Sequence, residues 1–302
     1  MRAADARVNV IPAYTVEQMC DQYNNGKRVP DFADYLARWR ANSRNARARL
    51  RHEADIVYGA APRQRIDLFR PESEAAAPLL VFAHGGYWQM LDKEDWSCIA
   101  APYVARGIAV AIVGYTLCPA TSVAGIAEEL RQACAFLYLD AAQYGIERGN
   151  ITISGHSAGG HLAAMMQATD WPARDPRLPA RMFRAAVAVS GLFDLEPLIV
   201  THLNQALQLT PPQARACSPV RMPKLAPETP MLVAVGGAES AEFLRQSSSL
   251  ALAWAGTRYR EEAGCNHFSV IDAFHDPAAA LFAATCDLIL APRYSGTVVQ
   301  AT

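Results

Sequence analysis

A serine between two glycines, at residues 155–159 (Gly-His-Ser-Ala-Gly), is the first place where residue types and spacing could do chemistry. Residues 151–154, just before it, have strand preference, and a small-residue helical pattern follows it. A turn from strand to helix holds such a serine in a strained conformation, and the glycines let strand and helix approach closely. The flanking patterns favour this interpretation over an ordinary glycine-rich turn. Ser157 is therefore the candidate nucleophile.

A serine hydroxyl needs a neighbouring base, usually an imidazole that a carboxylate orients. His267 is the candidate base because it lies in the loop after the last predicted strand, residues 258–262. The other histidines are expected to pack or hydrogen-bond beside the serine (His156, His161), to shape a glycine loop (His84), or to lie in unremarkable helical or loop contexts (His52, His202, His275).

The carboxylate of such a triad should lie between Ser157 and His267 in the chain. Glu239 is favoured because a glycine-rich turn after the preceding strand can deliver it to the edge of the sheet. Asp194, which follows an earlier strand, and Glu242, three residues after Glu239, remain alternatives.

Gly85 and Gly86, which follow another predicted strand, are candidates for the oxyanion hole. Their backbone N–H groups can meet the negative oxygen of a tetrahedral intermediate because no side chain blocks the approach. Ala158, directly after the nucleophile, is expected to supply a further N–H. No recognised metal-ligand spacing occurs in the sequence, so we expect no metal and no cofactor.

The segments that must position these residues alternate between strand and helix patterns. Residues 53–59 and 65–70 are predicted as an antiparallel pair at a sheet edge. Buried strands are predicted at residues 79–83, 108–113, 151–154, 185–189 and 231–235, with helices between them, one over 95–106. The alternation predicts an α/β fold with a mostly parallel central sheet and helices on both faces. Chemistry in such sheets lies beyond the carboxyl ends of the strands, where the candidate residues fall.

A helical stripe begins near Asp31 and includes the aromatic Trp39. Six arginines between Arg38 and Arg51 are interpreted as a solvated helix face rather than a nucleic-acid site. We predict a single domain over residues 1–302, with an N-terminal helical extension over 1–52 and a lid insertion over 191–225.

The 28 basic and 29 acidic side chains give a formal net charge of -1, which favours neither nucleic acid nor an anionic membrane as a partner. The seven cysteines are scattered without C-x-x-C spacing, and neither a secretion signal nor a spanning segment is evident. We expect a cytoplasmic protein with reduced thiols that binds a small-molecule substrate. The sequence leaves open whether the protein forms a homodimer.

The motifs resemble those of the α/β-hydrolase fold, with the elbow at 155–159 and an HGG-type loop at 84–86. Residues 84–88 (His-Gly-Gly-Tyr-Trp) resemble the HGGxW motif of the kynurenine formamidases (arylformamidases) and their bacterial relatives, which include esterases. Residues 239–247 are similar to the segment that carries the family's catalytic acid, although the family generally has Asp where Glu239 stands. The similarity extends from about Tyr14 to Phe268.

The resemblance implies a metal-independent serine hydrolase that cleaves an aryl formamide, N-formylkynurenine, to kynurenine and formate. The aryl leaving group needs an apolar slot, for which Tyr87, Trp88 and Phe193 are the expected walls. Two alternatives stay open. One is a carboxylesterase for short acyl or aryl esters, and the other is a non-catalytic hydrolase-like binding protein.

Overall fold

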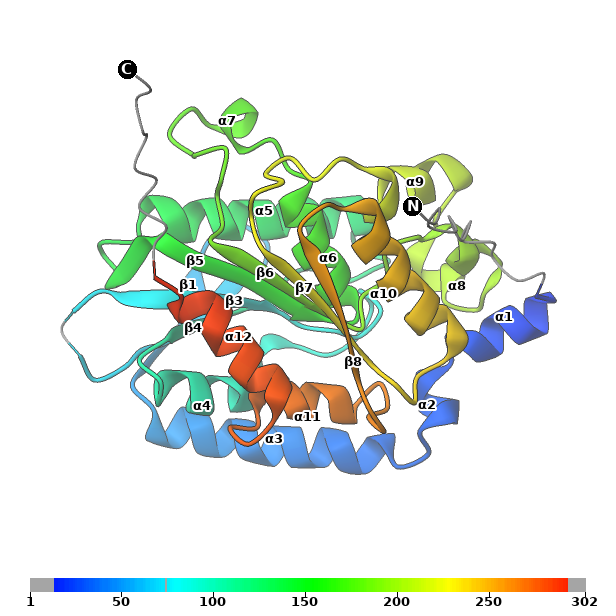
Figure 1. Ribbon diagram of the computed structural model, residues 1–302, viewed down its shortest axis with the longest axis horizontal. Helices are drawn as coiled ribbons and strands as arrows, with labels where there is room; N and C mark the ends of the chain where they lie inside the picture. The colour runs from blue at the N-terminus through cyan, green and yellow to red at the C-terminus, as the bar shows by residue number, and fades with distance from the viewer. Residues whose placement is uncertain (1–13, 74, 293–302) are drawn as a thin grey trace, which may run out of the picture.

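A central eight-stranded sheet with helices on both faces organises the protein (Figure 1). The computed structural model describes residues 14–73 and 75–292, so the first 13 residues of the predicted extension lie outside the described residues. The strand order is β1-β2-β4-β3-β5-β6-β7-β8. The first two pairs, β1 with β2 and β2 with β4, are antiparallel, and all the others are parallel. The predicted α/β architecture with a mostly parallel sheet is confirmed.

The elements follow one another mainly as alternating strands and helices. The strands are β1 (His52–Val57), β2 (Arg65–Phe69), β3 (Ala77–Ala83), β4 (Ala109–Val113), β5 (Ile146–His156), β6 (Ala185–Val189), β7 (Met231–Gly236) and β8 (Thr257–Glu262). The α-helices are α1 (Val16–Gln22), α2 (Asn25–Arg28), α3 (Phe32–Arg49), α4 (Ala100–Val104), α5 (Val123–Leu139), α6 (Ala158–Gln167), α7 (Trp171–Arg174), α8 (Asn204–Leu207), α9 (Pro211–Ala216), α10 (Ala241–Ala253), α11 (Ser269–His275) and α12 (Ala280–Leu290). Three 3-10 helices are η1 (Lys93–Ile99), η2 (Glu196–Val200) and η3 (Pro219–Arg221).

Two apolar clusters, one on each face of the sheet, form the core. Strands β4, β6 and β7 are buried throughout, as expected for parallel strands covered by helices on both faces. Residues of α5, α6 and α10 belong to one cluster, and residues of α3, α4, α11 and α12 belong to the other. The carboxyl ends of β3, β5, β6 and β7 therefore meet at one edge, held rigidly between two layers of helices.

Three local predictions differ from the structure. The helix over 95–106 is a 3-10 helix followed by a short α-helix, because a capping box at Asp92 starts the helical segment earlier, at Lys93. Strand β5 begins at Ile146, ahead of the predicted 151–154, and carries a register shift opposite β3. His52 is the first residue of β1 rather than a helical or loop residue.

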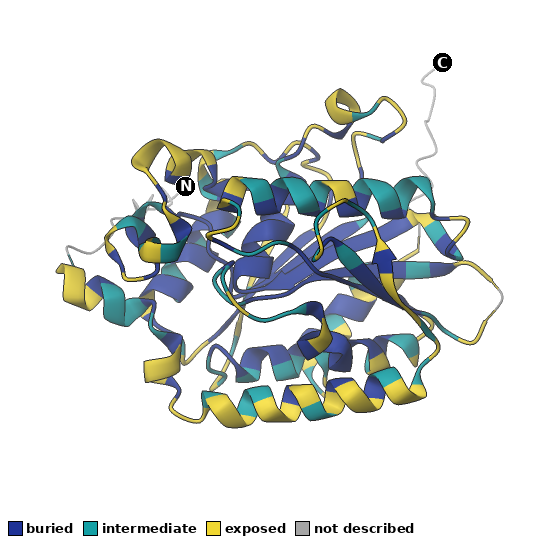
Figure 2. Cartoon of the chain, turned by 180° about the vertical axis from the view of Figure 1, so that it is seen from behind, coloured by how far each residue is buried: buried dark blue, intermediate teal, exposed yellow. Residues whose placement is uncertain are grey.

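Helix α3 lies along the molecule with an exposed outer face, as Figure 2 shows. Its inner face buries Trp39, whose ring lies 4.9 Å from that of Trp96 in η1. Several of its arginines make ion pairs with aspartates of other elements, Arg38 with Asp272 among them. The arginines that the sequence concentrates on this helix thus attach it to the rest of the fold.

Among the described residues, no helix on its own has the length and apolar character needed to cross a bilayer. Helices α11 and α12 meet that criterion only as a pair, with a bend of 46° between them.

Candidate active site

Ser157 stands at the sharp turn between β5 and α6. Its backbone has φ 56° and ψ -118°, a strained conformation for a residue with a side chain. A Cβ atom added to Gly155 would lie 2.2 Å from the carbonyl oxygen of Gly159, and one added to Gly159 would lie 1.9 Å from that of Ala83. The glycine spacing of the motif is therefore required by the close passage of α6 over β3 and β5.

His267 meets a carboxylate across the carboxyl edge of the sheet. Its Nδ1 lies 2.6 Å from Oε2 of Glu239, and both side chains are buried. The other carboxylate oxygen, Oε1, accepts hydrogen bonds from the hydroxyl of Ser190 and from the Gly236 N–H at 2.8 Å. A carboxylate held in this way fixes the orientation and the tautomer of the His267 imidazole. Nδ1 carries the proton and donates it to Glu239 in a hydrogen bond, which leaves Nε2 as the basic nitrogen.

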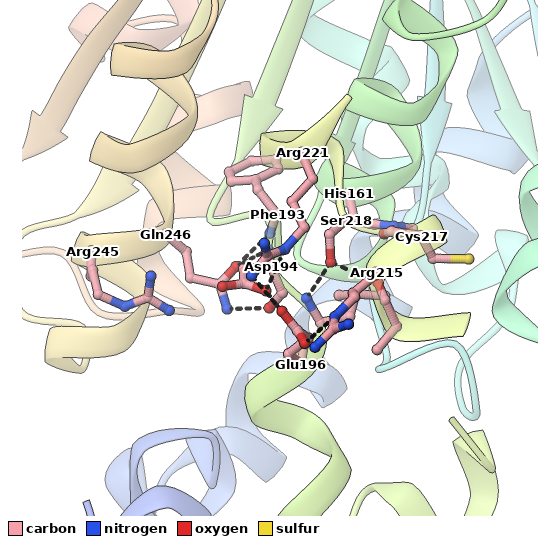
Figure 3. A network of polar contacts seen from close by, with 12 residues as sticks. His161, Phe193, Asp194, Glu196, Arg215, Cys217, Ser218, Arg221, Arg245 and Gln246 are labelled. Atoms are coloured by element: carbon pink, nitrogen blue, oxygen red, sulfur yellow. Dashed lines mark hydrogen bonds and ion pairs between the residues drawn. The ribbon is translucent and has the colours of Figure 1, made fainter. Parts of the chain in front are cut away.

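The two alternative carboxylates lie elsewhere. Asp194 belongs to a polar network beyond β6 (Figure 3), where it accepts the Glu196 N–H and lies 3.9 Å from the Arg221 guanidinium. Glu242 is buried on α10 and paired with Arg245. Of the three predicted carboxylates, the structure brings only Glu239 to His267.

The glycine loop after β3 passes directly beside the serine. A Cβ atom added to Gly85 would lie 3.2 Å from the Ser157 Cβ, so a larger residue would crowd the site. Gly86 has φ +110°, and a Cβ there would lie 2.2 Å from the Met90 carbonyl oxygen. Ala158 is the first residue of α6, where backbone N–H groups have no partner within the helix. The glycine loop and the start of α6 thus lie side by side at Ser157, and the role of their N–H groups as an oxyanion hole stays a prediction.

Two buried histidines shape this region. His84 contacts the Gly85 carbonyl oxygen through Nδ1 at 2.8 Å and stacks on Tyr115, and burial lowers the pKa of His84 to about 4. His156 contacts the His267 carbonyl oxygen through Nε2 at 2.8 Å. Burial also holds the pKa of His156 well below its usual value. Both rings are therefore neutral near pH 7 and serve the loops that carry the candidate residues.

Ser157 and His267 share one cavity of about 420 Å³. Its lining combines parts of the chain that lie far apart in sequence, and none of the lining residues has a charged carboxylate, lysine or arginine side chain. The lining residues are Tyr23, Asn24, Asn25, Gly26, Phe32, Trp39, Gly85, Gly86, Tyr87, Gln89, Met90, Leu91, Trp96, His156, Ser157, His202, Leu203, His267 and Phe268. Both the N-terminal extension and the 191–225 segment contribute. Their role as a lid stays a prediction.

Of the three expected walls, only Tyr87 lines this cavity. Trp88 is fully buried in the core, where its ring lies 5.0 Å from that of His161. Phe193 is also fully buried and fills the space beside Gly191. The assignment of Trp88 and Phe193 to the slot is therefore corrected: both are core residues.

Sequence reasoning missed the aromatic residues that do line the cavity, among them Phe32, Trp39, Trp96 and Phe268. The helical stripe that includes Phe32 and Trp39 was a signal that could have found them. No sequence pattern indicates that Trp96 lines the cavity. Among the described residues, no three His, Cys, Asp or Glu side chains gather in a way that could hold a metal ion.

Comparison with known proteins decides the family. The BD-FAE family profile matches residues 66–250. The chain belongs to the BD-FAE family. This BD-FAE protein is 31% identical to the kynurenine formamidase of Danio rerio over 253 residues, which cover 80% of this chain and 83% of that protein. It is also 31% identical to the kynurenine formamidase of Salmo salar over 232 residues, 74% of this chain and 76% of that one.

Solved structures agree with this placement. A Silicibacter sp. protein that carries a provisional description as a thioesterase is 37% identical, covers 88% of this chain and 98% of its own, and superposes with a TM-score of 0.77. A bacterial heroin esterase, 20% identical over 80% of this chain and 82% of its own, has a TM-score of 0.59 and shares the fold. The BD-FAE protein thus has the predicted α/β-hydrolase fold, and it is a hydrolase.

Proposed function

We propose that this BD-FAE protein is a metal-independent serine hydrolase that removes the formyl group from an aryl formamide, N-formylkynurenine. The observation that carries the proposal is the 2.6 Å contact between His267 Nδ1 and Glu239 Oε2, at the cavity that also holds Ser157. The similarity to kynurenine formamidases over four-fifths of the chain supports the substrate.

In the proposed mechanism, His267 Nε2 takes the proton of Ser157 as its Oγ attacks the formyl carbonyl carbon. The negative oxygen of the tetrahedral intermediate is stabilised by the N–H groups of Gly85, Gly86 and Ala158. His267 then returns the proton to the departing aryl amine, and the carbon–nitrogen bond breaks. A water activated by His267 hydrolyses the formyl ester on Ser157 and releases formate.

The cavity fits a substrate with a small acyl group and a large aryl leaving group. A formyl group needs little room beside Gly85, whereas the aromatic walls Phe32, Trp39 and Phe268 suit an aryl ring. The amides of Asn24 and Asn25 lie on the same lining and can meet the polar end of a kynurenine.

A carboxylesterase acting on short acyl or aryl esters is the second candidate. The uncharged lining favours it, because a neutral ester has no charge that must leave water when the ester enters such a cavity. Among the relatives, the isoprenylcysteine α-carbonyl methylesterase of Arabidopsis thaliana is 29% identical over 157 residues, half of this chain. Both candidates use the same catalytic groups.

The test compares hydrolysis of N-formylkynurenine with that of p-nitrophenyl acetate by the wild type, Ser157→Ala and Ser248→Ala. Ser248 is a matched control because its hydroxyl bonds the Arg245 carbonyl within α10, away from the cavity. We expect the larger kcat/KM for the formamide, and a loss of about 10⁴-fold or more in Ser157→Ala alone.

Each other outcome has a meaning. Turnover of the ester only would leave the mechanism in place and favour the carboxylesterase. Retained activity in Ser157→Ala would refute the assignment of the nucleophile.

A further inference from the structure

Two consecutive residues of the oxyanion loop have left-handed backbones. Tyr87 has φ 49° and Trp88 has φ 58°, and neither is a glycine. A left-handed conformation is unfavourable for a residue with a side chain, because its Cβ atom crowds the following carbonyl oxygen. The loop that carries Gly85 and Gly86 therefore keeps its shape only because its surroundings hold it there.

Trp88 provides one anchor from inside the protein. Its ring is fully buried against His161 of α6, and its carbonyl oxygen accepts the Cys118 N–H at 2.8 Å. This anchor belongs to the core of the fold.

Tyr87 provides the second anchor, and its partners come from the N-terminal extension. Its hydroxyl donates to the Tyr23 carbonyl oxygen at 2.7 Å and accepts from Asn25 Nδ2 at 3.2 Å. Burial raises the pKa of Tyr87 well above its usual value, so the hydroxyl remains a donor at every working pH. Residues 23–25, between the end of α1 and the first residue of α2, thus bind the loop that carries the oxyanion donors.

The same N-terminal segment reaches the other side of the site. The Tyr23 hydroxyl donates to Glu242 Oε2 at 2.8 Å and accepts from Gln246 Nε2 at 2.8 Å. Glu242 follows Glu239 by three residues, and Gln246 also binds the Phe193 and Asp194 N–H groups through its side-chain oxygen (Figure 3). Tyr23, Glu242 and Gln246 are all buried.

We propose that Tyr87 and Asn25 are positioning residues and that residues 23–25 form a clamp that fixes the oxyanion loop relative to α10, the helix that begins two residues after Glu239. The inference rests on the proposed serine-hydrolase function, but it does not depend on whether the substrate is a formamide or an ester. The N-terminal extension then contributes to catalysis itself and does more than cover the cavity.

Tyr87→Phe removes only the hydroxyl and keeps the ring. With p-nitrophenyl acetate, we expect kcat to fall by about 10- to 100-fold while KM changes little, because the oxyanion donors lose their alignment. The affinity for phenylboronic acid should fall by a similar factor, since its tetrahedral adduct with Ser157 places an oxygen at the same donors. A purely structural role would lower the melting temperature without moving kcat and boronate affinity together.

Tyr103→Phe is the matched control. That buried phenol also donates to a backbone carbonyl, of Phe274 at 2.6 Å, but it does not line the cavity. We expect wild-type kcat and boronate affinity from it.

Asn25→Ala supplies a second variant with a different chemistry. It should lower kcat in the same direction. The double variant with Tyr87→Phe should be no slower than Tyr87→Phe alone, because Tyr87→Phe already removes the hydrogen bond between Asn25 and the Tyr87 hydroxyl. Full kcat and boronate affinity in both single variants would overturn the clamp. Absence of wild-type turnover, or turnover that survives Ser157→Ala, would instead refute the proposed function.

Discussion

One contact, between a carboxylate oxygen and His267, distinguishes Glu239 from the other candidate carboxylates. Three carboxylates that follow strands between Ser157 and His267 are candidates in the sequence, which favours Glu239 through its glycine-rich turn but leaves Asp194 and Glu242 open. In the structure, Glu239 reaches His267 with one oxygen, while Ser190 and Gly236 bind the other. These fixed donors keep a glutamate, which is one methylene longer than an aspartate, in a single orientation.

Glu239→Gln tests that role. The amide keeps the shape but loses the negative charge that stabilises the imidazolium and selects its tautomer, so we expect kcat to fall by about 10³- to 10⁴-fold. Asp194→Asn is the matched control, because Asp194 faces Arg221 and not His267. The measurement is kcat on either substrate, with the melting temperature followed in parallel. A greater loss in Asp194→Asn than in Glu239→Gln would reject the assignment of Glu239.

At the scale of elements, each of the eight strands overlaps a segment predicted from the sequence, and the buried strands do so because short apolar runs between helices are typical of a parallel sheet. The patterns did not predict the direction in which some side chains point. The side chains of Trp88 and Phe193 were expected in the cavity, but left-handed backbone at 87–88 and the space beside Gly191 direct both into the core. The contribution of Trp96 depends on how η1 packs under α3, and such long-range packing leaves no local signal.

The junction of β5 and α6 makes a sharp prediction for a glycine. In Gly159→Ala, the new Cβ would meet the Ala83 carbonyl oxygen at 1.9 Å, and backbone cannot move aside as a flexible side chain can. We expect a loss of unfolding free energy of about 3 kcal/mol or more, since α6 must shift off the sheet. Urea unfolding followed by circular dichroism measures it.

Gly237→Ala is the control for that variant. Its added Cβ would contact neighbours at 3.4 Å or beyond, an ordinary van der Waals distance, and the residue is exposed. We expect stability within about 1 kcal/mol of the wild type. Equal stability of the two variants would mean that the elbow does not need its second glycine.

At the scale of the whole molecule, the interior holds several histidines in their neutral form. Burial lowers the pKa of His84 and of His161 to about 4, and it also lowers the pKa of His156 and of His275. Each of these neutral rings donates its one N–H to a backbone carbonyl oxygen. His161 Nε2, for example, bonds the Cys217 carbonyl oxygen at 2.8 Å and so links α6 to the 191–225 segment.

These histidines make the stability of the fold depend on pH in a defined direction. Between about pH 6.5 and 4, the unfolded chain binds protons that the folded chain excludes, so the free energy of unfolding falls as pH decreases. Each fully buried histidine should remove about 2 kcal/mol between pH 7 and pH 5. Carboxylates with lowered pKa values, such as Asp175, lose their contribution only at lower pH. The interval from pH 7 to pH 5 therefore reports mainly on the histidines.

His161→Gln separates titration from hydrogen bonding, because the glutamine amide can still donate to the Cys217 carbonyl but binds no proton. Urea unfolding at pH 7 and pH 5 should show a smaller decrease for this variant than for the wild type, by about 2 kcal/mol. An unchanged decrease would mean that His161 is already protonated, or exposed to water, in the folded protein.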